Sequence, residues 1–244
     1  MLTAESLLAK VVTFIAQKSL SAVGSLAFDK RKRACRALTK LYYCVQTLDD
    51  VTGQVKKTFG DFRGSGTAKS ESLVHALNNH MYDVSLATNM FIDLGQELHA
   101  GLEIIDPALA ECCHLLYVSK GDFLHFMSNC VRWERGGERP AIVLKRPSRR
   151  IEAVDLEVLY AETRAALARG EKHYWPESAF DDFHAEFTEV SVTFQDESVA
   201  DDVYEMLCRH SELLGQARNQ LRELLRTKFS IEEVLFQSDS HPYR

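Results

Sequence analysis

The apolar residues of segment 3–28 recur at helical spacing. They share one arc of a helical wheel, which Phe14 widens at one edge. The members of this arc are Leu8, Val11, Val12, Ile15, Val23 and Leu26. Lys18 interrupts the apolar run, so no uncharged stretch of about 18 or more residues is present to span a bilayer. The pattern predicts an amphipathic helix that does not cross a membrane.

Longer stretches of helical periodicity follow, and glycine and proline are scarce. The chain of 244 residues contains 12 Gly and 5 Pro, which favours long regular elements over many turns. Asp29 is a candidate cap for the second helix, and Asp106 followed by Pro107 is a typical helix start. The later predicted helices span about 29–59, 72–100, 107–133, 151–169 and 199–229, before a final short turn that a Ser230–Glu233 capping box begins. The predicted fold class is all-α, an antiparallel helical bundle of about six to seven helices.

Two segments interrupt the helical pattern and predict how the chain is divided. Residues 60–70 form a glycine-rich loop, and residues 134–150 contain two glycines, two prolines and a basic cluster. We therefore predict an N-terminal four-helix bundle over residues 1–133, a linker over 134–150, and an acidic C-terminal helical region over 151–244 that packs on the bundle. The segment SVTFQ, residues 191–195, alternates like a strand. It has no evident partner strand, so we expect it to be helical or irregular.

The net charge of −6 is unevenly distributed along the chain. Residues 1–150 carry 20 Lys or Arg and 15 Asp or Glu, a balance of +5. Residues 151–244 carry 9 and 20, a balance of −11. The first part is therefore suited to an anionic surface, or to the acidic second part of the same chain.

The cysteines indicate a reducing compartment. No CxxC pair occurs, and Glu5 lies where a secretory signal carries positive charge. We expect reduced, buried thiols in a cytoplasmic protein. The six residues are Cys35, Cys44, Cys112, Cys113, Cys130 and Cys208.

Two groups of residues resemble chemical sites but depart from the required spacing. Cys112-Cys113-His114 would point in three directions on a helix, and His75 and His80 lie about 140° apart around one, so neither group converges on a metal ion. Arg169 and His173 are one residue closer than in the Rx4H signature of HEPN ribonucleases, whose Arg–His pair must converge on one phosphate. We therefore predict no catalytic residue, no metal site and no cofactor, with a ribonuclease-like helical enzyme as the third alternative.

A basic run at the start of the second predicted helix is the strongest binding feature. It comprises Lys30, Arg31, Lys32, Arg33, Arg36 and Lys40. No aromatic residues are interleaved for base stacking, so nucleic acid is not the expected partner. The preceding amphipathic helix supplies apolar area, and each basic residue near an anionic leaflet adds about 1 kcal/mol. An anionic membrane contact is the functional interpretation, and a solvated helix face is the structural one.

Aromatic residues gather on both sides of the predicted linker. Those with the best claim to a partner-binding role are Trp133, Tyr174, Trp175 and Phe180. Aromatic side chains dominate protein interfaces but also fill cores. We expect them either to pack in the core or to anchor a partner protein.

The pattern of the first 130 residues resembles a known family. An amphipathic helix precedes a second helix that carries Arg31-Lys-Arg-Ala-Cys-Arg36, and a loop and two more helices follow. This order is similar to the HeLo-type four-helix cell-death bundles of fungal incompatibility proteins, bacterial conflict systems and the mixed-lineage kinase domain-like pseudokinase. The resemblance implies membrane disruption after oligomerisation, triggered by an attached sensor. It implies an inserting face of Leu8, Val12, Phe14 and Ile15, and lipid-phosphate contacts from Lys30, Arg31, Lys32, Arg33 and Arg36.

These observations lead to one expected function and a main alternative. We expect a non-enzymatic helical effector of a bacterial antiviral defence or cell-death system, which engages membrane through its amphipathic N-terminal helix and basic run. It would be cytoplasmic with peripheral membrane contact, and a partner protein or self-association is expected. The alternative is a helical accessory or adaptor subunit of a multiprotein complex, in which the first helix completes a core.

Overall fold

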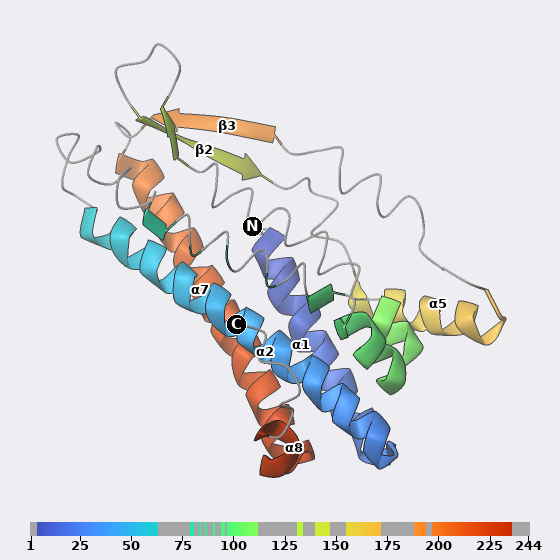
Figure 1. Cartoon of the computed structure of the whole chain (residues 1–244). Coiled ribbons are helices and arrows are strands. Elements are labelled where there is room, and N and C mark those ends of the chain that lie inside the picture. Colours follow the sequence, from blue (N-terminus) through green and yellow to red (C-terminus); the bar gives the residue numbers. More distant parts are fainter. Residues whose placement is uncertain are drawn as a thin grey trace.

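Three long helices lie side by side along the molecule: α1 (Ala4–Ala22), α2 (Phe28–Phe62) and α7 (Glu197–Lys228) (Figure 1). The computed structural model describes residues 4–62, 79–80, 83, 86, 90, 94–95, 97–111, 131–133, 140–146, 155–171, 188–193 and 197–235. A 3-10 turn, η1 (Val23–Ser25), reverses the chain between α1 and α2, and α7 packs along both helices. The predicted all-α fold class is confirmed by these helices.

The hydrophobic core is shared by helices from both ends of the chain. Apolar residues of α1 and α2 pack with those of α7 and with helical residues between 94 and 110. The largest fully buried side chains are Ile15, Leu38, Leu41, Leu102, Leu109, Leu207, Leu214, Leu221 and Leu224. Each such side chain stabilises the fold by about 1.5–3 kcal/mol relative to exposure. The predicted domain boundary at 134–150 stays a prediction, although α7 and α1 contribute to one core.

Local capping chemistry fixes several helix starts. Asp106 accepts a hydrogen bond at 2.9 Å from the backbone N–H of Ala108, which confirms the predicted start signal. Asp155 caps α5 (Leu156–Ala168) in the same way, so this helix begins five residues later than the sequence pattern predicts. Asp29 is not the cap of α2, because the helix begins at Phe28; its carboxylate lies in the first turn, where it favours the helix dipole.

A three-stranded antiparallel sheet departs from the predicted helices and linker. Strands β1 (Val131–Trp133), β2 (Pro140–Arg146) and β3 (Thr188–Thr193) pair in the order β1-β2-β3. Val131 faces Ile142, and Val143 faces Ser191. The expectation that residues 191–195 are helical or irregular is wrong over Ser191–Thr193, because the missing partner strand lies within the segment predicted as a linker.

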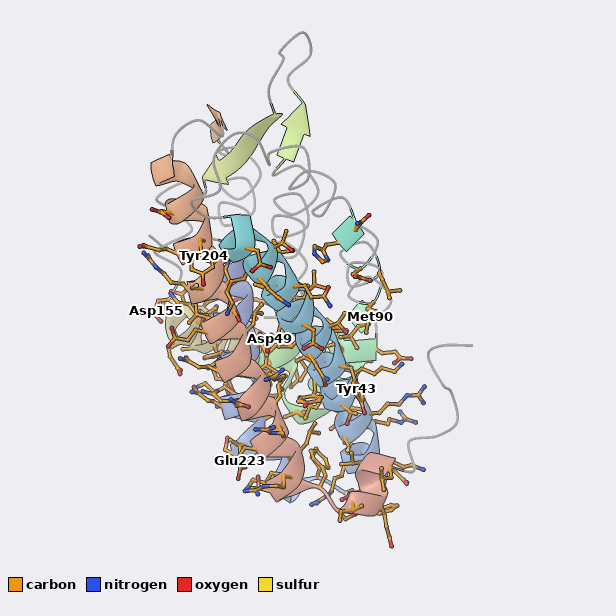
Figure 2. All side chains as sticks on the ribbon, turned by 90° about the vertical axis from the view of Figure 1, so that its left-hand side faces the viewer. Tyr43, Asp49, Met90, Asp155, Tyr204 and Glu223 are labelled. Atoms are coloured by element: carbon orange, nitrogen blue, oxygen red, sulfur yellow. The ribbon has the colours of Figure 1, made fainter. Side chains whose placement is uncertain are left out.

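Polar and small residues set how closely the helices approach. Asp49 on α2 forms an ion pair with Arg218 on α7 at 2.9 Å, and Figure 2 shows Asp49 on the side of α2 that faces α7. Gly101 is buried against α2, and a Cβ at this position would lie 2.3 Å from the Cβ of Ala37. Only a residue without a side chain therefore permits this helix–helix distance.

Candidate binding surface at one end of the bundle

The start of α2 and the end of α7 meet at one end of the bundle. There α7 gives way to the short helix α8 (Ile231–Leu235), at the end opposite the sheet (Figure 1). Ser230 and Glu233 form the predicted capping box. The backbone N–H of Ser230 donates to Glu233 Oε2 at 2.7 Å, and that of Glu233 donates to Ser230 Oγ at 3.1 Å.

Arg31 joins α2 to α8 and to the last turn of α7. Its Nε donates to Glu233 Oε1 at 2.7 Å, and its Nη2 donates to the carbonyl oxygen of Lys228. Its guanidinium lies 5.4 Å from the centre of the Phe229 ring, within the range of a cation–π contact. Burial raises the pKa of Glu233, but hydrogen bonds from Arg31 and Ser230 outweigh this effect and hold it below its usual range. Glu233 is therefore ionised at neutral pH, and its contact with Arg31 joins α8 to α2.

The structure divides the predicted basic run into two groups. Arg36 lies 3.8 Å from Glu97, and Lys40 also pairs with Glu97, so these two cations face another helix, as Arg31 faces α8. The other three, Lys30, Lys32 and Arg33, have exposed side chains. Within the described residues they take part in no ion pair. They are the cations of the run that solvent and a binding partner reach without rearrangement.

Large apolar side chains are exposed at the same end of the bundle. Phe28 is 70% exposed, Ile231 is 77% exposed and Leu235 is 66% exposed. Ile231 and Leu235 are four residues apart and therefore share one face of α8. We use the name bundle-end surface for these side chains and the exposed cations together: Phe28, Lys30, Lys32, Arg33, Ile231 and Leu235.

A cavity of about 570 Å³ opens between the start of α2 and α8. Its walls include Leu26, Phe28, Arg31, Lys32, Glu232 and Glu233. Cavities of roughly 300–1,000 Å³ accommodate small molecules or parts of larger ones. Exposed apolar side chains and a cavity with charged groups of both signs in its lining therefore occur at the same end of the bundle.

The predicted inserting face of the first helix is placed in the core. Val12 and Ile15 are fully buried and Phe14 is nearly so. Leu8 lies in α1, and its side chain falls outside the described residues. Insertion into a membrane through this face stays a prediction, and it requires α1 to leave the bundle.

Lys18, which interrupts the apolar run of α1, joins α1 to α5. Its Nζ lies 2.7 Å from Glu157 Oε2, 5.2 Å from the centre of the Phe14 ring and 5.0 Å from that of Tyr160. Tyr160 in turn donates a hydrogen bond to Asp106 at 2.5 Å. The charge therefore serves a helix–helix contact within the protein.

Of the four predicted partner-binding aromatics, only Trp133 lies within the described residues. Trp133 ends strand β1, and its side chain is outside the described residues. Tyr174, Trp175 and Phe180 lie entirely outside them. Their role stays a prediction.

Two titratable groups of the described core, His210 and Cys44, have strongly shifted pKa values. Burial, and secondarily the charge of Arg209, lowers the pKa of His210 to about 3, so its imidazole is neutral at pH 7. Burial raises the pKa of the Cys44 thiol to about 12 against a smaller effect of Lys40, which leaves it unreactive. Arg169 pairs with Glu171 at 2.6 Å, and His173 is outside the described residues. Among the residues described, no three His, Cys, Asp or Glu side chains are grouped to hold a metal ion.

Phe28, Ile231, Leu235 and the two glutamates of α8 are the functional candidates that sequence reasoning missed. Phe28 reads in sequence as the last apolar residue of the first helix, and Ile231 and Leu235 as part of a short terminal turn. The capping-box signal located α8 along the chain, but the long-range Arg31–Glu233 contact is what places it beside α2.

Comparisons of the chain with protein-family models, with curated proteins and with solved structures find no match. Of the helices described, none is both long and apolar enough to cross a membrane.

Proposed function

We propose that the chain is a non-enzymatic helical effector that binds anionic membrane surfaces through the bundle-end surface. One observation carries this proposal: three exposed cations in the first turns of α2 and three exposed large apolar side chains, one on α2 and two on α8, occur at the same end of the bundle. This is the combination by which interfacial proteins bind lipid, with apolar side chains entering the headgroup region and cations attracted to anionic headgroups. The wider role, in bacterial defence or cell death, rests on the resemblance to HeLo-type bundles.

The geometry supports a contact in which α1 stays in the bundle. Lys30, Lys32 and Arg33 are exposed while the core remains closed, and Phe28, Ile231 and Leu235 need no rearrangement to reach a surface. Release of α1 would expose at least Val12, Phe14 and Ile15 at a cost of several kcal/mol. The bundle-end surface is therefore the first contact, with or without a later release of α1.

The experiment is co-sedimentation with vesicles of phosphatidylglycerol and phosphatidylcholine at increasing salt. We expect binding to weaken with salt, because exposed charges are screened over about 10 Å at 0.1 M. The triple variant Lys30→Glu, Lys32→Glu and Arg33→Glu should bind at least about 100-fold more weakly, since each lost cation contributes about 1 kcal/mol and each new carboxylate is repelled.

A matched control separates this surface from net charge. The triple variant Lys57→Glu, Arg209→Glu and Arg222→Glu changes the net charge equally, at exposed sites on α2 and α7 outside the bundle-end surface. It should keep most of the binding. Equal loss in both triple variants, or no vesicle binding by the unaltered protein, would refute the proposal.

The alternative function, a helical accessory subunit, is favoured by the burial of α1. In that function α1 completes a core, and Val11, Val12 and Ile15 are fully buried. It predicts that a stoichiometric partner co-purifies, whereas insolubility after deletion of α1 is expected of both functions, because both keep α1 in the bundle. Vesicle binding with the residue dependence given above would favour the membrane effector instead.

A further inference from the structure

The cavity beside α8 carries one cation and one anion that the internal ion pair does not neutralise. Arg31 and Glu233 compensate each other at 2.7 Å. Of the charged residues lining the cavity, this leaves Lys32 and Glu232, both exposed. A ligand that matches the cavity therefore carries charges of both signs close together.

The aromatic residue in the cavity wall indicates what kind of positive group a matching ligand carries. Phe28 is exposed and lines the same cavity as Glu232. Aromatic rings attract alkylammonium groups through their π faces, and a carboxylate adds a second attraction. Lys32 supplies a compact cation of the kind that binds phosphate. Together these groups fit a phosphate ester joined to an alkylammonium.

We infer that the cavity beside α8 binds the zwitterionic headgroup of a phospholipid, phosphatidylcholine or phosphatidylethanolamine, within the membrane contact proposed above. Lys32 contacts the phosphate, and Phe28 with Glu232 contacts the ammonium. The inference rests on the proposed function. A lipid is favoured over a free metabolite because α8, which contributes Glu232 and Glu233 to the cavity, also exposes Ile231 and Leu235, outside the cavity lining, as apolar side chains for acyl chains to contact.

The test compares two vesicle compositions with the same fraction of phosphatidylglycerol. In one, phosphatidylcholine forms the rest of the bilayer; in the other, an uncharged galactolipid does. The variants are Glu232→Gln at the cavity and Glu205→Gln, which removes the same charge from an exposed site near the other end of α7.

The inference predicts that the two variants change the affinity for phosphatidylcholine vesicles in opposite directions. Removing a carboxylate strengthens purely electrostatic binding to anionic vesicles, so Glu205→Gln should raise the affinity slightly for both compositions. Glu232→Gln should do the same with the galactolipid but lower the affinity about two- to fivefold with phosphatidylcholine. Phe28→Leu should also lower it only with phosphatidylcholine, and its exposure makes a folding defect unimportant.

Each outcome decides between the two claims. If Glu232→Gln raises the affinity for both compositions, the inference is wrong and the membrane proposal stands. If no anionic vesicle is bound, both fail. Free phosphocholine separates a lipid from a free metabolite. If it displaces phosphatidylcholine vesicles poorly while the variants behave as expected, the ligand is the lipid. If free phosphocholine binds the cavity as tightly as the vesicles do, the assignment to a lipid is overturned.

Discussion

The apolar stripe of α1 and the bundle-end surface both contain large apolar side chains, but in opposite environments. In α1, Val12 and Ile15 are fully buried, whereas Phe28 and Ile231 are more than two-thirds exposed. From the sequence, the α1 stripe and the adjacent basic run are predicted to form one membrane-binding unit. The structure separates them: the stripe belongs to the core, and only part of the basic run faces solvent. An apolar segment next to a basic one in sequence is therefore not evidence for one continuous surface.

The largest expected effect tests the buried half of this comparison. Ile15→Ala should lower the free energy of unfolding by about 2–5 kcal/mol, because it leaves a cavity in the shared core. Phe28→Ala, its exposed counterpart, should change it by less than about 0.5 kcal/mol. Urea unfolding of both variants measures the difference. Equal effects would show that α1 is not packed as described.

A smaller effect separates two adjacent cations of the basic run. Arg31→Ala should cost about 1–3 kcal/mol of stability, because the 11% exposed side chain of Glu233 loses its ion pair and the Lys228 carbonyl loses a donor. Lys32→Ala should leave stability within about 0.5 kcal/mol and weaken vesicle binding instead. If Arg31→Ala unfolded in urea like the unaltered protein, α8 would not be held by this contact.

Two glycines sharpen the comparison between close packing and open surface. Gly101→Ala should destabilise by about 1–3 kcal/mol, because the new Cβ would lie 2.3 Å from that of Ala37. Gly53→Ala, in α2 with no atom within 4 Å of an added Cβ, should stabilise by about 0.5–1 kcal/mol. Thermal unfolding of both variants measures whether each substitution stabilises or destabilises the protein. A stabilising Gly101→Ala would mean that residues 97–105 do not approach α2 so closely.

Much of the helical architecture follows from local signals in the sequence. The 3.6-residue periodicity located α1, α2, α5 and α7, and hydrogen bonds confirm the caps predicted at Asp106 and Ser230. The sheet was not predicted, because β2 and β3 are more than 40 residues apart: residues 191–195 alternate like a strand, but their partner lies in a segment whose composition predicts a linker.

The division of the basic run could not be predicted either. Arg31 and Lys32 are neighbours with the same charge, and nothing local distinguishes them. Their difference arises from Glu233, which is 202 residues away from Arg31 in sequence and 2.7 Å away in space. Likewise, the position of Lys18 predicts that the first helix does not span a membrane, but its contact with Glu157 and Tyr160 depends on tertiary structure.

Hydrogen exchange with and without anionic vesicles tests the central claim most directly, because it follows α1 and the bundle end in one experiment. The account predicts that vesicles slow exchange over residues 28–33 and 231–235, while the amides of residues 9–16 stay protected in both conditions. Loss of protection over residues 9–16 on vesicle binding, with no change at the bundle end, would contradict it and show that α1 is the membrane-binding element.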